Sequence, residues 1–179
     1  GIWGGQLQRW RTGVFNGNQP ESPTAFLPND NEAALMPLVA KMSDDLLEFS
    51  EKPKEVQILD EDGKLLLAGD NDRRFFEAAW LHKYNGKYYF SYSTGDTHYI
   101  CYAIGDNPYG PFIYKGKILN PVVGWTSHHS ICEFKGKWYL FYHDSSLSKG
   151  VTHLRSVKIA EIEYDKDGNI KTLEPYVKK

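Results

Sequence analysis

The sequence is poor in cysteine and in long hydrophobic stretches, and each shortage excludes a class of protein. Its 179 residues include two cysteines, Cys101 and Cys132, which lack the paired spacing of a metal site. Both lie among apolar neighbours in predicted strands, so we interpret them as buried thiols. No apolar stretch approaches the ~20 residues that a membrane-spanning helix needs, so the sequence predicts no role in a membrane.

Basic runs and nucleotide-binding signatures are also absent. The net charge is −2, with Lys and Arg spread along the chain, so nucleic acid is a poor candidate partner. The sequence contains no P-loop, GxGxxG, GxSxG or HExxH motif. The sequence therefore gives no support for a P-loop kinase, a dinucleotide-binding enzyme, an esterase of the GxSxG type or a zinc protease.

Aromatic side chains, in contrast, are abundant, at 15% of the chain, and they gather in predicted strands. Residues 73–93 form two such strands around Asn85-Gly86, the preferred dipeptide for a two-residue hairpin turn. One carboxylate, Glu77, stands in the apolar front part of this hairpin. Such a carboxyl is either solvated in a cleft or has its pKa raised by desolvation.

The same hairpin occurs again in residues 127–142. Gly86 and Gly136 are 136 − 86 = 50 residues apart, and at that offset aromatic residues fall on aromatic residues. An all-β period of about 50 residues is typical of a four-stranded propeller blade. The alternative is a sandwich that contains two unrelated hairpins. We therefore predict an all-β fold, with the propeller favoured.

The length of the chain raises a problem for a closed propeller. Closure takes at least four blades, whereas 179 residues at about 50 per blade give about three and a half. Residues 1–10 read as the middle of a strand, so we expect this chain to be part of a larger protein. The remaining blades would lie on a further segment or on a companion chain.

Residues 32–50 allow two interpretations. Their apolar residues match one face of a helix, but Pro37 would break that helix near its middle. We therefore predict an outer strand over 37–43, followed by a turn at 44–47.

The candidate residues for catalysis and ligand binding are Glu77, His128 and Arg155. Glu77 lies between Phe76 and Ala78, and a raised pKa would suit a general acid of glycosidic cleavage. The alternative is a capped or salt-bridged surface carboxylate, for example one paired with Arg73 or Arg74. His128 and His129 are adjacent on a predicted strand and must face opposite ways, so they cannot share one ion.

At the 50-residue offset Ala78 falls on His128, which would bring Glu77 and His128 near the channel of neighbouring blades. A buried core histidine is the alternative for His128. Arg155 could hold a carboxylate or a sugar hydroxyl if it faces the channel, or be a solvated edge charge if it does not. Trp3 and Trp125 could stack on sugars or belong to the core.

Several motifs together resemble glycoside hydrolase family 43. They are Phe75-Phe76-Glu77-Ala78-Ala79-Trp80, Tyr84-Asn85-Gly86-Lys87-Tyr88-Tyr89, Gly124-Trp125-Thr126-Ser127-His128-His129-Ser130-Ile131 and Arg155-Ser156-Val157. The resemblance implies a five-bladed propeller, of which residues 1–179 would supply roughly the last three blades, from late in the second to the fifth.

The resemblance also implies roles. The family inverts anomeric configuration with three acidic residues, and Glu77 matches the general acid. The base and the carboxylate that orients the acid lie in the early blades, so we expect this chain alone to be inactive. His128 matches a histidine at the axis that binds a divalent cation, often calcium. The sugar-binding positions that the resemblance assigns are Arg155, Thr97, Trp3 and Trp125.

Family 43 contains β-xylosidases, α-L-arabinofuranosidases, xylanases and arabinanases. An exo-acting β-xylosidase that cleaves hemicellulose oligosaccharides is our first expectation, with α-L-arabinofuranosidase second and the endo-acting enzymes as further alternatives. Two non-catalytic alternatives are a carbohydrate-binding propeller and a kelch-type protein-interaction propeller.

Overall fold

The computed structural model describes residues 2–3, 28–125 and 127–176, with the backbone alone for 2–3. Every regular element in these ranges is a strand, which confirms the all-β prediction. The strands are β1 (Ile2–Trp3), β2 (Leu38–Val39), β3 (Lys54–Glu55), β4 (Ile58–Leu59), β5 (Glu77–Tyr84), β6 (Lys87–Ser93), β7 (Ile100–Gly105), β8 (Phe112–Leu119), β9 (His129–Phe134), β10 (Lys137–Asp144) and β11 (Ser156–Ile162).

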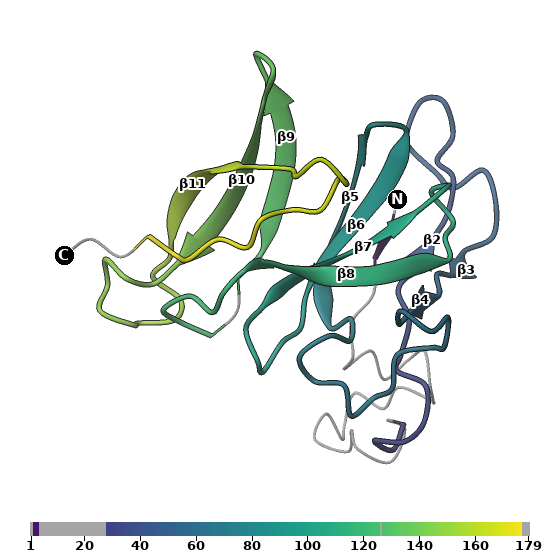
Figure 1. The fold of residues 1–179 in the computed structure, drawn as a ribbon, viewed down its shortest axis with the longest axis horizontal. Coiled ribbons are helices and arrows are strands. Elements are labelled where there is room, and N and C mark those ends of the chain that lie inside the picture. The colour runs from purple at the N-terminus through teal and green to yellow at the C-terminus, as the bar shows by residue number, and fades with distance from the viewer. Residues whose placement is uncertain (1, 4–27, 126, 177–179) are drawn as a thin grey trace.

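The strands form three sheets. One has the order β1-β2-β3, the second β4-β8-β7-β6-β5 and the third β11-β10-β9. All pairs are antiparallel except β4 with β8. The second and third sheets stand side by side, and the chain after β11 crosses back, so that Leu173 pairs with Leu119 at the end of β8 (Figure 1).

Both predicted hairpins are present. Asn85 and Gly86 have φ of 45° and 79°, and Lys135 and Gly136 have φ of 53° and 79°, as a two-residue hairpin turn requires. β5 and β9 both end at the residue before their turn, 50 residues apart. The third strands start at Ile100 and Ser156, which are 56 residues apart, because the loop over 145–155 is longer than its counterpart over 94–99.

The second sheet is buried on both faces. Phe90, Cys101 and Ala103 point to a core shared with the first sheet, whereas Tyr89 and Tyr102 point to a core shared with the third sheet. Adjacent residues of a strand face opposite ways, so an unbroken apolar run such as that of β6 and β7 suits a sheet covered twice. Each such aromatic side chain contributes roughly 2–3 kcal/mol by its burial.

The third sheet is buried on one face only in the described part of the chain. Leu140 and Tyr142 face the shared core, while Val157 and Ile159 on the opposite face are 74% and 61% exposed. Cys132 lies on that open face, so the prediction that both thiols are buried is wrong for Cys132. It is right for Cys101, whose burial raises the pKa of its thiol to about 12.

The ambiguous segment over 32–50 is extended. Leu38 and Val39 form β2 between β1 and β3, and residues 44–47 turn, with Leu46 at a φ of 62°. The prediction of a strand is confirmed, although β2 is shorter than the predicted range. The prediction that it is an outer strand is wrong, because β2 pairs with a strand on each side. No helix long and apolar enough to cross a membrane occurs in the described ranges.

An edge strand of each sheet takes part in the contacts between the sheets. β5 contacts both β1 and β9, and Trp80 Nε1 in β5 donates to the carbonyl oxygen of Ile131 in β9 at 3.1 Å. In a propeller the innermost strands of the blades surround the axis, so β1, β5 and β9 are the strands that line it here.

Candidate active site

Glu77 opens β5, on the sheet edge that lines the axis. The register of β5 against β6 shifts between Glu77 and Trp80, and Ala78 has a φ of 61°. A bulge of this kind bends a strand and redirects side chains, and such bulges are frequent next to active sites. Phe75, two residues before Glu77, is buried, while the Glu77 side chain remains 31% exposed. The carboxyl group is thus partly open to solvent, close in the sequence to a buried aromatic residue.

The partner of Glu77 comes from the third sheet. His128 Nε2 lies 3.3 Å from Glu77 Oε1, and the imidazole is 52% exposed. The sequence prediction that the 50-residue repeat brings these two side chains together is therefore confirmed in geometry. The alternative partners Arg73 and Arg74 have other contacts in the described part of the chain. Arg73 pairs with Asp70 at 3.1 Å, and buried Arg74 donates to the carbonyl oxygen of Ala68 at 2.8 Å.

Arg155 reaches the same corner through His143. The backbone N–H of His128 donates to His143 Nε2 at 3.0 Å, and Arg155 Nη1 lies 3.4 Å from that nitrogen. Burial, followed by the charge of Arg155, lowers the pKa of His143. Arg155 sits one residue before β11, on the exposed side, so it faces the site from a strand end. Glu77, His128, His143 and Arg155 form one continuous group.

His129 points the other way, as the alternation of a strand predicted. Its Nε2 lies 2.7 Å from Ser91 Oγ in β6. Desolvation, together with the neighbouring His128, lowers the pKa of His129 to about 3, which keeps this imidazole neutral. His129 is therefore the core histidine of the pair, and His128 is the one that faces the site.

Thr97 belongs to a turn that packs beside Glu77. Gly95 has a φ of 78°, and a Cβ there would lie 2.5 Å from the ring of Phe76, so only glycine lets the turn approach this closely. The Thr97 hydroxyl contacts the carbonyl oxygen of Asn71 at 2.8 Å and Thr94 Oγ1 at 2.7 Å. Thr97 is therefore rigidly held near the residue that precedes Glu77.

Trp125 is half exposed, at 53%. Its ring contacts the ring of His98, the residue after Thr97, edge-on, with the ring centroids 5.8 Å apart. It is thus a surface ring and not a core residue. Trp3 lies in β1 next to β5, but its side chain falls outside the described part of the structure, so the prediction of an aromatic wall there stays a prediction.

His143 is the residue that the sequence reasoning missed, although the repeat contained a signal for it. At the same offset, 143 − 50 = 93, His143 corresponds to Ser93, which pairs with Glu77 across β5 and β6. Its counterpart pair is Ser127 with His143, where Ser127 Oγ donates to the His143 carbonyl oxygen at 2.9 Å. The repeat therefore contains enough information to predict that His143 lies on the strand next to the site.

The group has the parts that proton donation and hydroxyl binding need. A carboxyl can protonate a leaving oxygen, and a guanidinium can bind hydroxyls in fixed geometry. A metal site is less complete, because the described ranges contain no cluster of three His, Cys, Asp or Glu side chains that could hold an ion. His128 alone could supply one ligand.

Comparison with known proteins supports the same reading. A family profile described as glycosyl hydrolases family 43 matches residues 28–170. A "Xylosidase/arabinosidase" from Bacteroides ovatus is 63% identical over 97% of this chain and 52% of its own length. A "Beta-xylosidase" from Xylanibacter ruminicola is 58% identical over 97% of this chain and 52% of its own length.

A solved structure is also similar throughout. CoXyl43, a GH43 β-xylosidase/α-arabinofuranosidase from a compost microbial metagenome, was determined with xylotriose in a calcium-free form. It superposes with a TM-score of 0.90 at 60% identity, over 99% of this chain and 54% of that one.

The chain spans about half the length of the curated relatives it matches. The structural relatives are five-bladed β-propellers, which confirms the predicted fold, and the chain covers about half of that fold. The profile match, the level of identity and the superposition agree, and the chain belongs to the glycosyl hydrolases of family 43.

Proposed function

We propose that this chain forms part of an inverting glycoside hydrolase that removes terminal xylosyl or arabinosyl residues from hemicellulose oligosaccharides, with β-xylosidase activity first. The observation that carries the proposal is the group of Glu77, His128 and Arg155 at the strands that line the axis. The names of two relatives, a xylosidase/arabinosidase and a β-xylosidase, favour these sugars.

In this proposal Glu77 is the general acid, which protonates the glycosidic oxygen as the bond to the sugar breaks. Arg155 binds a sugar hydroxyl at the end of the pocket. Thr97, Trp125 and Trp3 line further parts of the sugar site. Inversion needs a second carboxylate about 6.5–9.5 Å from the acid, with a water molecule between them. The family resemblance assigns that base, and the carboxylate that orients Glu77, to the other blades.

The open face of the third sheet supports a larger catalytic unit. Phe134, Val157 and Ile159 are all exposed there, at 59%, 74% and 61%, which is an unusual cluster of apolar surface on one sheet face. A further blade of the same propeller would cover it in the way that the second sheet covers the opposite face. We therefore propose that catalysis requires blades beyond the three sheets described.

A divalent cation beside His128 is the second part of the proposal. The imidazole is exposed next to Glu77, and one similar structure is specified as calcium-free. Calcium prefers oxygen ligands, so water and the remaining blades would complete its shell. A bound cation would supply positive charge at the axis, and His128 would hold it there.

The test of the function is hydrolysis of xylobiose and xylotriose by the complete propeller, followed by NMR of the first sugar released. We expect α-xylose from a β-linked substrate, release from one end only, and no turnover by residues 1–179 alone. Retention of configuration, or cleavage in the middle of long xylan chains, would exclude an inverting exo-xylosidase. Binding of xylotriose without hydrolysis would identify a carbohydrate-binding propeller instead.

Metal removal has a separate expected outcome. Treatment of the complete propeller with a chelator should lower kcat, and added calcium should restore it, because the cation fixes charges at the axis. The same treatment of His128→Ala should have a much smaller effect. Unchanged activity of the chelated wild-type protein would leave His128 as a residue that only pairs with Glu77.

A further inference from the structure

His143 stands between His128 and Arg155 in the site, and neither the family match nor the sequence motifs assign it a role. Its Nε2 receives the backbone N–H of His128 at 3.0 Å and faces Arg155 Nη1 at 3.4 Å. An imidazole nitrogen that accepts hydrogen bonds carries no proton, so the ring proton is on Nδ1. Two donors from two different segments therefore converge on one lone pair.

The other ring nitrogen of His143 adds no polar contact. Nδ1 is buried and makes no hydrogen bond within the described ranges, as is also true of Nδ1 of the core histidine His129. Within these ranges, the polar contacts of the His143 ring are therefore the two at Nε2, and both lead to residues of the site.

Arg155 is held in a way that leaves part of its guanidinium available. Nε donates to the carbonyl oxygen of Thr152 at 3.0 Å, and Nη1 faces His143. The guanidinium has five N–H groups in a planar fork, and its remaining N–H groups make no hydrogen bond to other described residues. Two anchors fix the plane of the fork and leave its outer edge for a ligand.

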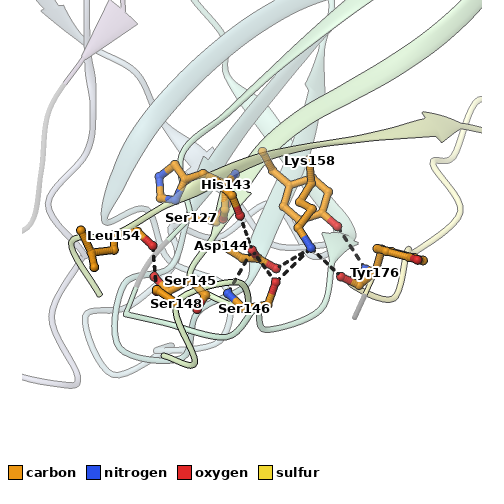
Figure 2. Close-up of polar contacts among 11 residues, drawn as sticks. Ser127, His143, Asp144, Ser145, Ser146, Ser148, Leu154, Lys158 and Tyr176 are labelled. Atoms are coloured by element: carbon orange, nitrogen blue, oxygen red, sulfur yellow. Dashed lines mark hydrogen bonds and ion pairs between the residues drawn. The ribbon is translucent and has the colours of Figure 1, made fainter. Parts of the chain in front are cut away.

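The backbone that carries His143 is itself locked. Ser127 Oγ donates to the His143 carbonyl oxygen at 2.9 Å, which ties the residue before His128 to the end of β10. On the opposite side of the strand, the buried carboxylate of Asp144 lies 3.3 Å from Lys158 Nζ, and Lys158 also donates to Ser146 Oγ and to the Tyr176 carbonyl oxygen at 3.0 Å each (Figure 2).

We propose that His143, whose ring is fixed by the backbone N–H of His128, is a positioning residue that orients the Arg155 guanidinium toward the sugar next to Glu77. This inference rests on the proposed glycosidase function. It assigns His143 an effect on substrate binding that passes through Arg155, and no proton transfer. A side chain that accepts at the same place should replace it, and an apolar side chain of similar size should not.

The experiment compares His143→Leu and His143→Gln with the wild type in the complete propeller, with xylobiose as substrate. We expect kcat/KM of His143→Leu to fall about tenfold, mostly through KM, because Arg155 loses an anchor. The amide oxygen of His143→Gln can accept both donors, so its KM should stay within about threefold of the wild-type value. The matched control is His153→Leu, at an exposed histidine in the loop over 145–155, which should leave both constants unchanged.

A double-mutant cycle decides whether the effect passes through Arg155. In an Arg155→Ala background, His143→Leu should cost almost nothing further, because the residue it positions is gone. An equal cost in both backgrounds, or wild-type KM for His143→Leu, would overturn the inference. If the unmodified propeller hydrolyses no xylobiose, the proposed function has failed, and a xylose titration of the same variants followed by calorimetry then tests the positioning role alone.

Discussion

Replacement of Glu77 by glutamine in the complete propeller should reduce kcat on xylobiose about a thousandfold, since general acid catalysis contributes on the order of 10²–10⁴. The amide keeps the size of the side chain at the bulge before Ala78 but has no acidic proton to transfer. An aryl xyloside with a good leaving group needs little protonation, so its kcat should fall about tenfold or less. Steady-state kinetics on both substrates measures the difference.

The control for Glu77→Gln is Glu163→Gln, at an exposed carboxylate whose ion pair with Lys171 lies far along the chain from the site. It should leave both substrates unaffected. If Glu77→Gln slowed the two substrates equally, the role of Glu77 would be positional or structural, and another group would have to protonate the leaving oxygen.

The hairpins and the repeat were predictable because local chemistry dictates them. Asn85-Gly86 and Lys135-Gly136 adopt the positive φ angles that two-residue turns require, and these turns fix the register of β5 with β6 and β9 with β10. The register in turn sets which side chains reach the axis. The position of a turn and the period of the repeat are therefore enough to predict the approach of Glu77 and His128.

The features that the sequence did not predict correctly have a common physical origin, which is the packing between sheets. Cys132 has apolar neighbours on its strand, yet it lies on the face of the third sheet that no other described sheet covers. Strand alternation tells which residues share a face, but it does not tell which face is covered. The same limit applies to Arg155, whose position depends on the loop over 145–155, a segment with no counterpart of equal length in the second sheet.

A buried ion pair between Lys158 and Asp144 holds that loop. Its loss is the second change for which we expect a large effect, in this case on stability. The side chains of Lys158 and Asp144 are 13% and 0% exposed, and Ser146 and Ser156 also donate to the carboxylate. Burial opposes ionisation, but the hydrogen bonds from Ser146 and Lys158 outweigh it and hold the pKa of Asp144 below its usual range. The pair closes the ends of β10 and β11, directly beneath His143 and Arg155.

Lys158→Met should therefore destabilise the protein by about 3 kcal/mol, because it leaves the Asp144 carboxylate buried without its cation. For a domain of this size that corresponds to a fall in Tm of about 10 °C, measured by calorimetry. The matched control is Lys137→Met, which removes the exposed ion pair with Glu161 at the other end of the same two strands. That change should cost less than about 1 kcal/mol.

The double variant Lys158→Met with Asp144→Asn separates charge from packing. It removes both charges, and the asparagine oxygen can still accept from Ser146 and Ser156, so most of the lost Tm should return. If the double variant were as unstable as Lys158→Met, the lysine would act through its contacts with Ser146 and Tyr176 and not through the carboxylate. If the double variant recovered Tm but had a higher KM than the wild type, the ion pair would also set the position of Arg155, because stability and substrate binding would then respond to different parts of the same network.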